Sequence, residues 1–261
     1  MDQRTLPEAG SSAGEKRMET PGPAELSAVQ KKATGEKIDL FCHILPKKYN
    51  EALLKKSRPC YNHEINRNRP ALTDLELRFK TMDKFDGLKQ VLTLGAPPIE
   101  FANSRQDAVD LARMANDEMA ELLNKYPGRF VAAVASLPMS DVDASLREAD
   151  RAINELNFKG VQIFSSINGK PLDSPMFQGL YEKMAQNDLP ILIHPVRDRN
   201  VPDYPGEKSA KYTLFLAFGW PFDTTIAVGR LVFSGILEKY QNLILWSCAG
   251  FTVISFYGMN S

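Results

Sequence analysis

A chain of 261 residues is long enough for one large α/β domain, and a second full domain would exceed this length. Basic and acidic residues balance at 32 each, so no net charge attracts the chain to nucleic acid or to an anionic membrane. No apolar run reaches the roughly 18 residues of a membrane-spanning helix, and three cysteines are too few for a disulfide framework. We therefore expect a cytoplasmic protein that acts on a small molecule, with no nucleic-acid or membrane partner.

The first 36 residues differ in composition from the rest of the chain. They are rich in Ser, Gly, Pro, Glu and Lys and contain almost no large apolar side chain. Such a segment cannot bury enough apolar surface to offset the entropy lost on ordering. We predict a disordered tail over residues 1–36 and a single folded unit over residues 37–261.

From residue 37 onward, short apolar runs alternate with amphipathic stretches. Six runs are short and apolar enough to be strands buried on both faces, and they cover residues 38–44, 90–94, 130–137, 160–164, 190–194 and 243–247. Apolar residues that recur every three or four positions predict helices over residues 104–126, 141–156, 174–187 and 221–240. This pattern is clearest over residues 104–126.

Alternating strands and helices are typical of right-handed βαβ units around a parallel sheet. The sheet could be an open doubly wound one or a closed barrel. A dinucleotide-binding sheet of the first kind would carry a GxGxxG segment after a strand, and this sequence has none. We therefore predict an α/β fold of the TIM-barrel, (β/α)8 type.

Two of the three histidines lie at the predicted carboxyl ends of strands. His43 ends the first strand and His194 ends the fifth. Catalytic groups of barrel enzymes gather at this end, and a neutral imidazole there is a good ligand for a divalent metal. Strand alternation also predicts that Asp39, Phe41 and His43 share the interior face. The alternative is that each histidine is a hydrogen-bonded core residue.

The third histidine, His63, lies in the polar stretch Tyr-Asn-His-Glu-Ile-Asn-Arg. We interpret it as a residue of a solvated loop, which could close over a pocket.

The segment Ile-Asp-Leu-Phe-Cys-His-Ile-Leu-Pro, residues 38–46, resembles the first-strand motif of the amidohydrolase superfamily. The similarity is to the branch that includes aminocarboxymuconate-semialdehyde decarboxylase and γ-resorcylate decarboxylase. Matching segments follow in the same order at residues 69–74, 82–83, 91–94, 116–118, 125–127, 160–164, 171–173, 194–195 and 219–222. The resemblance implies a metal-dependent hydrolase or carboxy-lyase with a TIM-barrel fold.

The resemblance also implies a set of metal ligands, which this sequence matches in part. The paired first-strand histidines of the family fall on Phe41 and His43, so only the second is present. The fifth-strand histidine falls on His194, and the sixth-strand histidine falls on Cys248. No residue matches the eighth-strand aspartate, because the sequence ends at Ser261 after about six strands. The fold expected from the resemblance is thus a truncated barrel.

A catalytic divalent site usually has three protein ligands and an open position. His43 and His194 supply two, and a Cys248 thiolate could be the third, with zinc or manganese as the cofactor. Cys248 could instead be a small buried residue of a strand. Phe41 cannot bind a metal and would give the pocket an apolar floor.

Three further residues are candidates for binding a substrate. Arg69 and Arg197 could hold a carboxylate through paired hydrogen bonds, although arginines near loops are commonly solvated or paired with structural carboxylates. Trp220 is expected at the mouth of the barrel, where it either packs or stacks on a substrate. Asp74 belongs to a matched segment and is equally suited to capping a helix.

Two functions remain open at this point. The first is a metal-dependent hydrolase or decarboxylase that acts on a small carboxylic or aromatic acid. The second is a catalytically impaired homologue that binds a ligand or a partner subunit, for example as a homo-oligomer. In either case the first and sixth strands of an incomplete barrel should have unpaired edges with exposed apolar surface.

Overall fold

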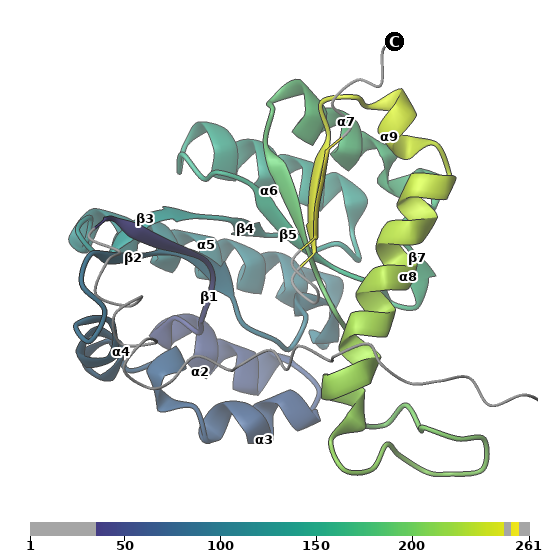
Figure 1. Cartoon of the computed structure of the whole chain (residues 1–261), viewed down its shortest axis with the longest axis horizontal. Helices are drawn as coiled ribbons and strands as arrows, with labels where there is room; N and C mark the ends of the chain where they lie inside the picture. The colour runs from purple at the N-terminus through teal and green to yellow at the C-terminus, as the bar shows by residue number, and fades with distance from the viewer. Residues whose placement is uncertain (1–34, 248–251, 256–261) are drawn as a thin grey trace, which may run out of the picture. The chain divides into compact units, whose positions relative to one another are not determined.

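The computed structural model describes residues 35–247 and the backbone of residues 252–255. The described elements belong to one compact unit, Glu36–Ser261 (Figure 1). The tail predicted over residues 1–36 and the candidate ligand Cys248 lie outside the described residues, apart from residues 35 and 36. In the described part of the chain, every helix is too short or too polar to cross a membrane.

All six predicted strands are present, and all pair in parallel. They are β1 (Lys37–Ile44), β2 (Leu88–Leu94), β3 (Phe130–Ala133) with β4 (Ala135–Ser136), β5 (Val161–Phe164), β8 (Pro190–His194) and β9 (Ile244–Ser247). The predicted strand 130–137 is divided at Val134, so that β3 pairs with β2 while β4 pairs with β5.

The order of the strands in space follows their order in the chain. A doubly wound sheet would reverse direction at a switch point, whereas a barrel adds each strand beside the last. The order β1-β2-β3 continues through β4-β5-β8-β9 without a reversal, which is the barrel arrangement. The described strands form an incomplete ring, because β1 pairs only with β2 among them.

The predicted helices are also present, with residues that explain their ends. They are α5 (Arg105–Lys125), α6 (Val142–Asn154), α7 (Gln178–Gln186) after the 3-10 turn η3 (Pro175–Phe177), α8 (Trp220–Phe233) and α9 (Ile236–Lys239). Ser104 and Asp141 cap α5 and α6 by accepting hydrogen bonds from Asp107 N and Ala144 N. Gly235, with φ of +76°, ends the helix predicted over 221–240 and starts α9.

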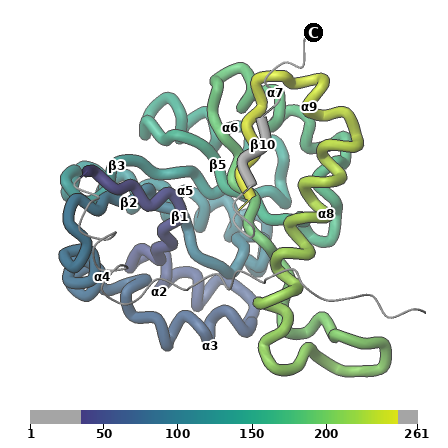
Figure 2. Tube along the Cα trace, in the orientation of Figure 1, coloured from purple at the N-terminus to yellow at the C-terminus, as the bar shows by residue number. Residues whose placement is uncertain are grey.

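Helices also occupy the segment between β1 and β2, for which we predicted no regular structure from the sequence. They are α2 (Lys47–Lys56), α3 (Tyr61–Arg67), the 3-10 turn η1 (Pro70–Leu72) and α4 (Leu75–Met82). In the view of Figure 2, α2, α3 and α4 appear on one side of β1 and β2, and η1 contacts β1, α3 and α4. Asp74 caps α4 by accepting a hydrogen bond from Leu77 N, which confirms the capping alternative.

One prediction about strand edges is confirmed and the other is wrong. The outer edge of β1 is free among the described residues, and Ile38 and Leu40 are 49% and 44% exposed. The edge of β9 is covered, because β10 (Thr252–Ser255) pairs with it in antiparallel fashion. Residues 252–255 therefore continue the sheet beside β9, which the sequence motifs did not indicate.

The remaining short elements shape the end of the sheet where β1, β5 and β8 terminate. The hairpin of β6 (Ser166–Ile167) and β7 (Lys170–Pro171) follows β5, and the turn η2 (Ile99–Phe101) follows β2. A π-helix, η4 (Phe215–Gly219), leads into α8. The core packs the strands against helices, and α5 buries Leu111, Ala115 and Met119. Burial of a side chain as large as Leu111 or Met119 contributes about 1.5–3 kcal/mol.

Candidate functional site

The structure brings His43 and His194 together at the carboxyl ends of β1 and β8, with ring centroids 5.0 Å apart. In the order of the sheet, β8 lies four steps from β1, which would put the two strands roughly 19 Å apart in a flat sheet with 4.8 Å spacing. The short distance therefore requires the sheet to curl as a barrel wall does. The two imidazoles face one common space.

The tautomer of His194 follows from its hydrogen bond. Its Nδ1 lies 2.6 Å from the carbonyl oxygen of Pro195, which can only accept, so Nδ1 carries the hydrogen. Burial lowers the pKa of His194 to about 4, and the side chain is 2% exposed. The ring is therefore neutral at physiological pH, with the lone pair of Nε2 free for a metal or a hydrogen-bond donor.

His43 is held in a similar way. Its Nδ1 lies 2.9 Å from the hydroxyl oxygen of Thr93 on β2. Burial lowers the pKa of His43 well below its ordinary value, and the charges of His194, Arg78 and Arg69 lower it further. Both imidazoles are thus neutral, which is the protonation state of a metal ligand.

Aromatic rings surround the histidine pair. Phe41 lies with its ring centroid 4.5 Å from that of His43 and 6.0 Å from that of His194. Phe164 and Trp220 approach His194 at 5.0 Å and 5.5 Å. The two imidazoles are therefore packed among aromatic rings on several sides.

The predicted orientation of Asp39 is wrong. A bulge lies between Asp39 and Cys42, which face Gln90 and Leu92 on β2, so three steps along β1 match two along its neighbour. The extra residue moves Asp39 out of the alternation that places Phe41 and His43 on the interior face. Its carboxylate instead accepts a hydrogen bond from the Cys42 thiol at 2.6 Å and from the Phe41 amide at 3.1 Å.

The described residues supply two of the predicted metal ligands. Within residues 35–247, no group of three His, Cys, Asp or Glu side chains is arranged to hold an ion. The two imidazoles fit a divalent metal by their proximity and neutrality, and the Nε2 lone pair of His194 is available to it. The candidate third ligand, Cys248, lies outside the described residues, so the ligand set found here is incomplete for a catalytic site.

The candidate substrate-binding residues lie around this pair. Arg69 is exposed and begins η1, close enough to His43 for its charge to act there. Arg197 lies 3.8 Å from the Asp223 carboxylate and donates to the carbonyl of Pro202. The Trp220 indole donates to the carbonyl of Arg197 at 2.9 Å, which fixes the tryptophan against His194.

We predicted that His63 lies in a solvated loop, and this prediction is wrong. The residue lies in helix α3. Its ring nitrogens are 3.4 Å from the Ser57 hydroxyl and 3.8 Å from the Cys60 thiol. Burial lowers its pKa, with a smaller contribution from the charge of Arg67. The helix was missed because the segment is polar and only seven residues long.

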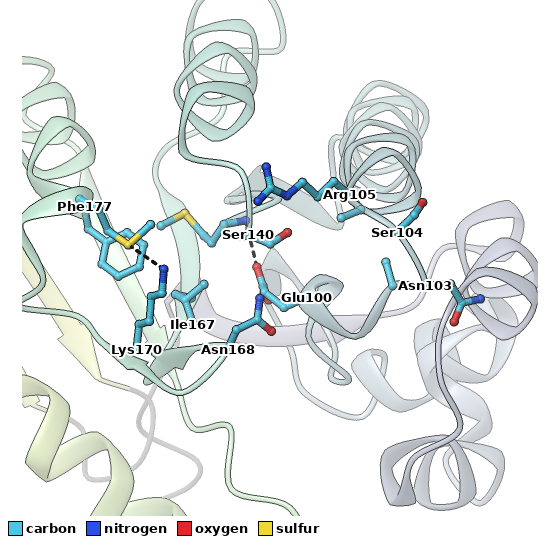
Figure 3. A pocket seen from close by; sticks show the side chains of 13 residues that line it. Glu100, Asn103, Ser104, Arg105, Ser140, Ile167, Asn168, Lys170 and Phe177 are labelled. Carbon is cyan, nitrogen blue, oxygen red and sulfur yellow. Dashed lines mark hydrogen bonds between the residues drawn. The ribbon is translucent and has the colours of Figure 1, made fainter.

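Sequence reasoning also missed two residues that act near the strand ends. Arg78 lies on the buried face of α4 with Leu75 and Met82, and that spacing in the sequence was a readable signal. Glu100 lies in η2 and accepts a hydrogen bond from the Met139 amide at 3.0 Å. It lines a cavity of about 330 Å³ beside Arg105, Ser140 and Lys170 (Figure 3).

Comparisons with known proteins identify the family of this chain. The model of the amidohydrolase family matches residues 38–246, and the chain belongs to that family. A 2-amino-3-carboxymuconate-6-semialdehyde decarboxylase of Dictyostelium discoideum is 30% identical over 226 residues, 79% of this chain and 60% of the relative. A γ-resorcylate decarboxylase of Rhodococcus jostii is 31% identical over 179 residues, 64% of this chain and 53% of the relative.

A solved structure gives the same result for the fold. A 5-carboxyvanillate decarboxylase of Novosphingobium aromaticivorans, complexed with manganese and 4-hydroxy-3-methoxy-5-nitrobenzoic acid, matches with a TM-score of 0.66 and 25% identity. The match covers 83% of this chain and 65% of that one. The chain therefore spans between 53% and 65% of the length of these relatives.

Proposed function

We propose that this protein is a metal-dependent carboxy-lyase that acts on a small aromatic carboxylic acid. The observation that carries the proposal is the pair of neutral imidazoles, His43 and His194, facing one space at the strand ends. The names of the relatives favour decarboxylation over hydrolysis, because both curated relatives are called decarboxylases.

In this proposal His43 and His194 hold a divalent ion, zinc or manganese, through Nε2, and Cys248 is the candidate third ligand. Manganese is supported by its presence in the solved relative. When bound, such an ion supplies polarisation of a substrate oxygen. The hydrogen bonds of the two Nδ1 atoms to Thr93 and Pro195 fix the orientation of each ring.

The substrate is held by the surrounding side chains. Phe41, Phe164 and Trp220 pack on the aromatic ring and keep water away from it. Arg69 is exposed and has a free guanidinium face for a carboxylate, while Arg197 shares its charge with Asp223. We therefore assign carboxylate binding first to Arg69 and then to Arg197.

The test is an assay of carbon dioxide release from 2,6-dihydroxybenzoate and 5-carboxyvanillate, with protein loaded with manganese or zinc. We expect release by the native sequence and its loss in His194→Ala. Arg69→Met should raise KM more than it lowers kcat, because it removes a binding contact. Protein that binds metal and both acids yet releases no carbon dioxide would rule out the lyase.

A second function, a catalytically impaired homologue that binds a ligand or a partner subunit, is supported by Phe41. This side chain occupies the place of the first histidine in the family motif, and the described residues offer two ligands instead of three. Phe41→His restores the missing imidazole. If the native protein is impaired, Phe41→His should gain at least tenfold in metal affinity, and activity should appear only in the variant.

We propose a cytoplasmic location and self-association for either function. Cys42 and Cys60 are free thiols, as expected in a reducing compartment. Helix α8 exposes Phe222, Ile226 and Phe233 on one face, which supports contact with another copy of the chain. Sedimentation velocity over a wide range of protein concentration tests the association, and a monomer throughout would contradict it.

A further inference from the structure

Arg78 is a buried arginine whose hydrogen bonds all go to uncharged groups. The residue is 7% exposed and lies on the inner face of α4. Its guanidinium donates to the side-chain oxygen of Gln90 at 2.9 Å, to the carbonyl of Ala71 at 3.2 Å and to the carbonyl of His43. Burying a cation without a bonded carboxylate is costly, and an apolar side chain could fill the same space.

The three acceptors belong to three separate segments that meet at the candidate site. His43 ends β1, Gln90 lies in β2, and Ala71 lies in η1, two residues after Arg69. One rigid, planar guanidinium therefore connects the strand that carries a proposed metal ligand to the turn that carries a proposed substrate-binding arginine.

The end of β1 has few other attachments. Among the described residues it pairs only with β2, so its outer edge has no neighbouring strand. Beyond that pairing, the Leu45 amide donates to the carbonyl of Leu72 at 2.8 Å, and the Gly95 amide donates to the carbonyl of Ile44 at 3.0 Å. The hydrogen bond from Arg78 to the His43 carbonyl thus fixes the backbone of His43. The imidazole of this residue must keep a defined direction if it is to bind a metal.

We propose that Arg78 is a positioning residue, which holds His43 and the Arg69 turn in a fixed relation without touching metal or substrate. The inference rests on the proposed function for its purpose, but the geometry it predicts can be measured without metal. The reporter is the 2.9 Å contact between His43 Nδ1 and the Thr93 hydroxyl, which keeps Nδ1 hydrogen-bonded only while β1 stays in place.

The experiment is nuclear magnetic resonance of protein labelled with ¹⁵N in histidine, at pH 8 and in the presence of a chelator. The sequence has three histidines, so the spectrum contains three imidazoles, which His43→Ala and His194→Ala assign. In the native sequence we expect the Nδ1 signal of His43 to have the chemical shift of a hydrogen-bonded ring nitrogen. In Arg78→Met we expect that chemical shift to change, with unchanged signals from His63.

Arg151→Met is the matched control. Arg151 is also largely buried, but its guanidinium bonds carboxylates, those of Glu148 on α6 and Asp117 on α5. Both helices are far from β1 in the sequence. If Arg78 only stabilised the fold, the two variants would disturb His43 equally. Unchanged His43 signals in folded Arg78→Met, or an equal change in Arg151→Met, would overturn the proposal.

Arg78→Lys replaces Arg78→Met if the latter does not fold. Its single ammonium cannot reach Ala71, Gln90 and His43 at once, so the His43 signals should still change, and unchanged signals would again overturn the proposal. A manganese titration of the same proteins separates the two claims. Native protein that binds no manganese contradicts the proposed function and leaves the resonance test valid. If it does bind, Arg78→Met should weaken binding about tenfold or more.

Discussion

At the scale of single residues, burial controls the charge state of the groups near the strand ends. Glu100 is the carboxyl group for which this effect can be tested directly. Burial raises its pKa to about 7, against the opposing effect of hydrogen bonds from its own amide and that of Met139. The folded protein therefore prefers the neutral carboxyl, while the unfolded chain ionises near pH 4.3.

We predict that Glu100 weakens the folded state as pH rises. The contribution is fully favourable below about pH 4.3 and is lost as pH rises to about 7, by roughly 3–4 kcal/mol. Glu100→Gln removes this titration, so the variant should gain stability relative to the native protein between pH 5 and pH 8. Urea unfolding at several pH values measures the difference. Exposed Glu155→Gln is the control, and parallel profiles for all three proteins would contradict the prediction.

A second prediction concerns the hydroxyl that orients His43. Thr93 is fully buried, and valine has nearly its shape, so Thr93→Val removes the bond to Nδ1 with little change in packing. We expect manganese affinity to fall about tenfold, because outer hydrogen bonds orient metal-binding imidazoles. Calorimetric titration measures it, with Thr81→Val on the exposed face of α4 as the control. Equal affinity in both variants would show that Thr93 does not orient the ring.

Residue-level prediction from the sequence succeeded where chemistry depends on position along a strand. The proximity of His43 and His194 follows from two parallel strands that end at the same rim. The hydrogen bonds of Thr93 and Arg78 could not be predicted, because each depends on side-chain packing between segments that are separate in the sequence. The bulge after Asp39 depends on a local mismatch between β1 and β2, which alternation alone does not reveal.

At the scale of elements, one close approach between β5 and β8 demands glycine. Gly160 has φ of +154°, and a Cβ there would lie 2.7 Å from the carbonyl oxygen of Pro190. Because that oxygen is backbone, it cannot move aside without shifting β8. We predict that Gly160→Ala lowers the free energy of unfolding by more than about 2 kcal/mol, as measured by urea unfolding.

Gly229 provides the matched control in α8. It lies in the interior of this helix, and a Cβ there would have no heavy atom within 4 Å. Alanine should therefore stabilise the protein by about 0.5–1 kcal/mol through the helix preference of alanine. A stabilising Gly160→Ala, or two variants with the same effect, would contradict the close approach.

The elements that the sequence predicted well are those with strong internal signals. Helices α5 and α6 have capping residues and long apolar faces, and the six parallel strands have buried apolar cores. Helices α2, α3 and α4 are short and polar, so tertiary packing rather than intrinsic preference stabilises them. Pairing between strands likewise explains two features that we did not predict. The predicted strand divides at Val134 because β4 pairs with β5, and β10 forms by pairing antiparallel with β9.

At the scale of the whole molecule, the strand order, the curl of the sheet and the family match describe one fold. The 5.0 Å distance between His43 and His194 depends on this curl, since the two strands are not neighbours. The proposed chemistry therefore depends on the described elements keeping the sheet curved. These elements span part of the length of the relatives. Family motifs predicted the fold, whereas the ligand set departs from them at Phe41.

The central claim is that His43 and His194 bind one divalent ion together. It is tested most directly by the metal content of the purified full chain after loading with manganese or zinc, measured by mass spectrometry for the native sequence, His43→Ala and His194→Ala. His63→Ala is the control for a histidine outside the pair. We predict close to one ion per chain in the native protein and in His63→Ala, and loss of the ion in each of the other variants. Native protein without bound metal, or metal content unaffected by both substitutions, would contradict the account.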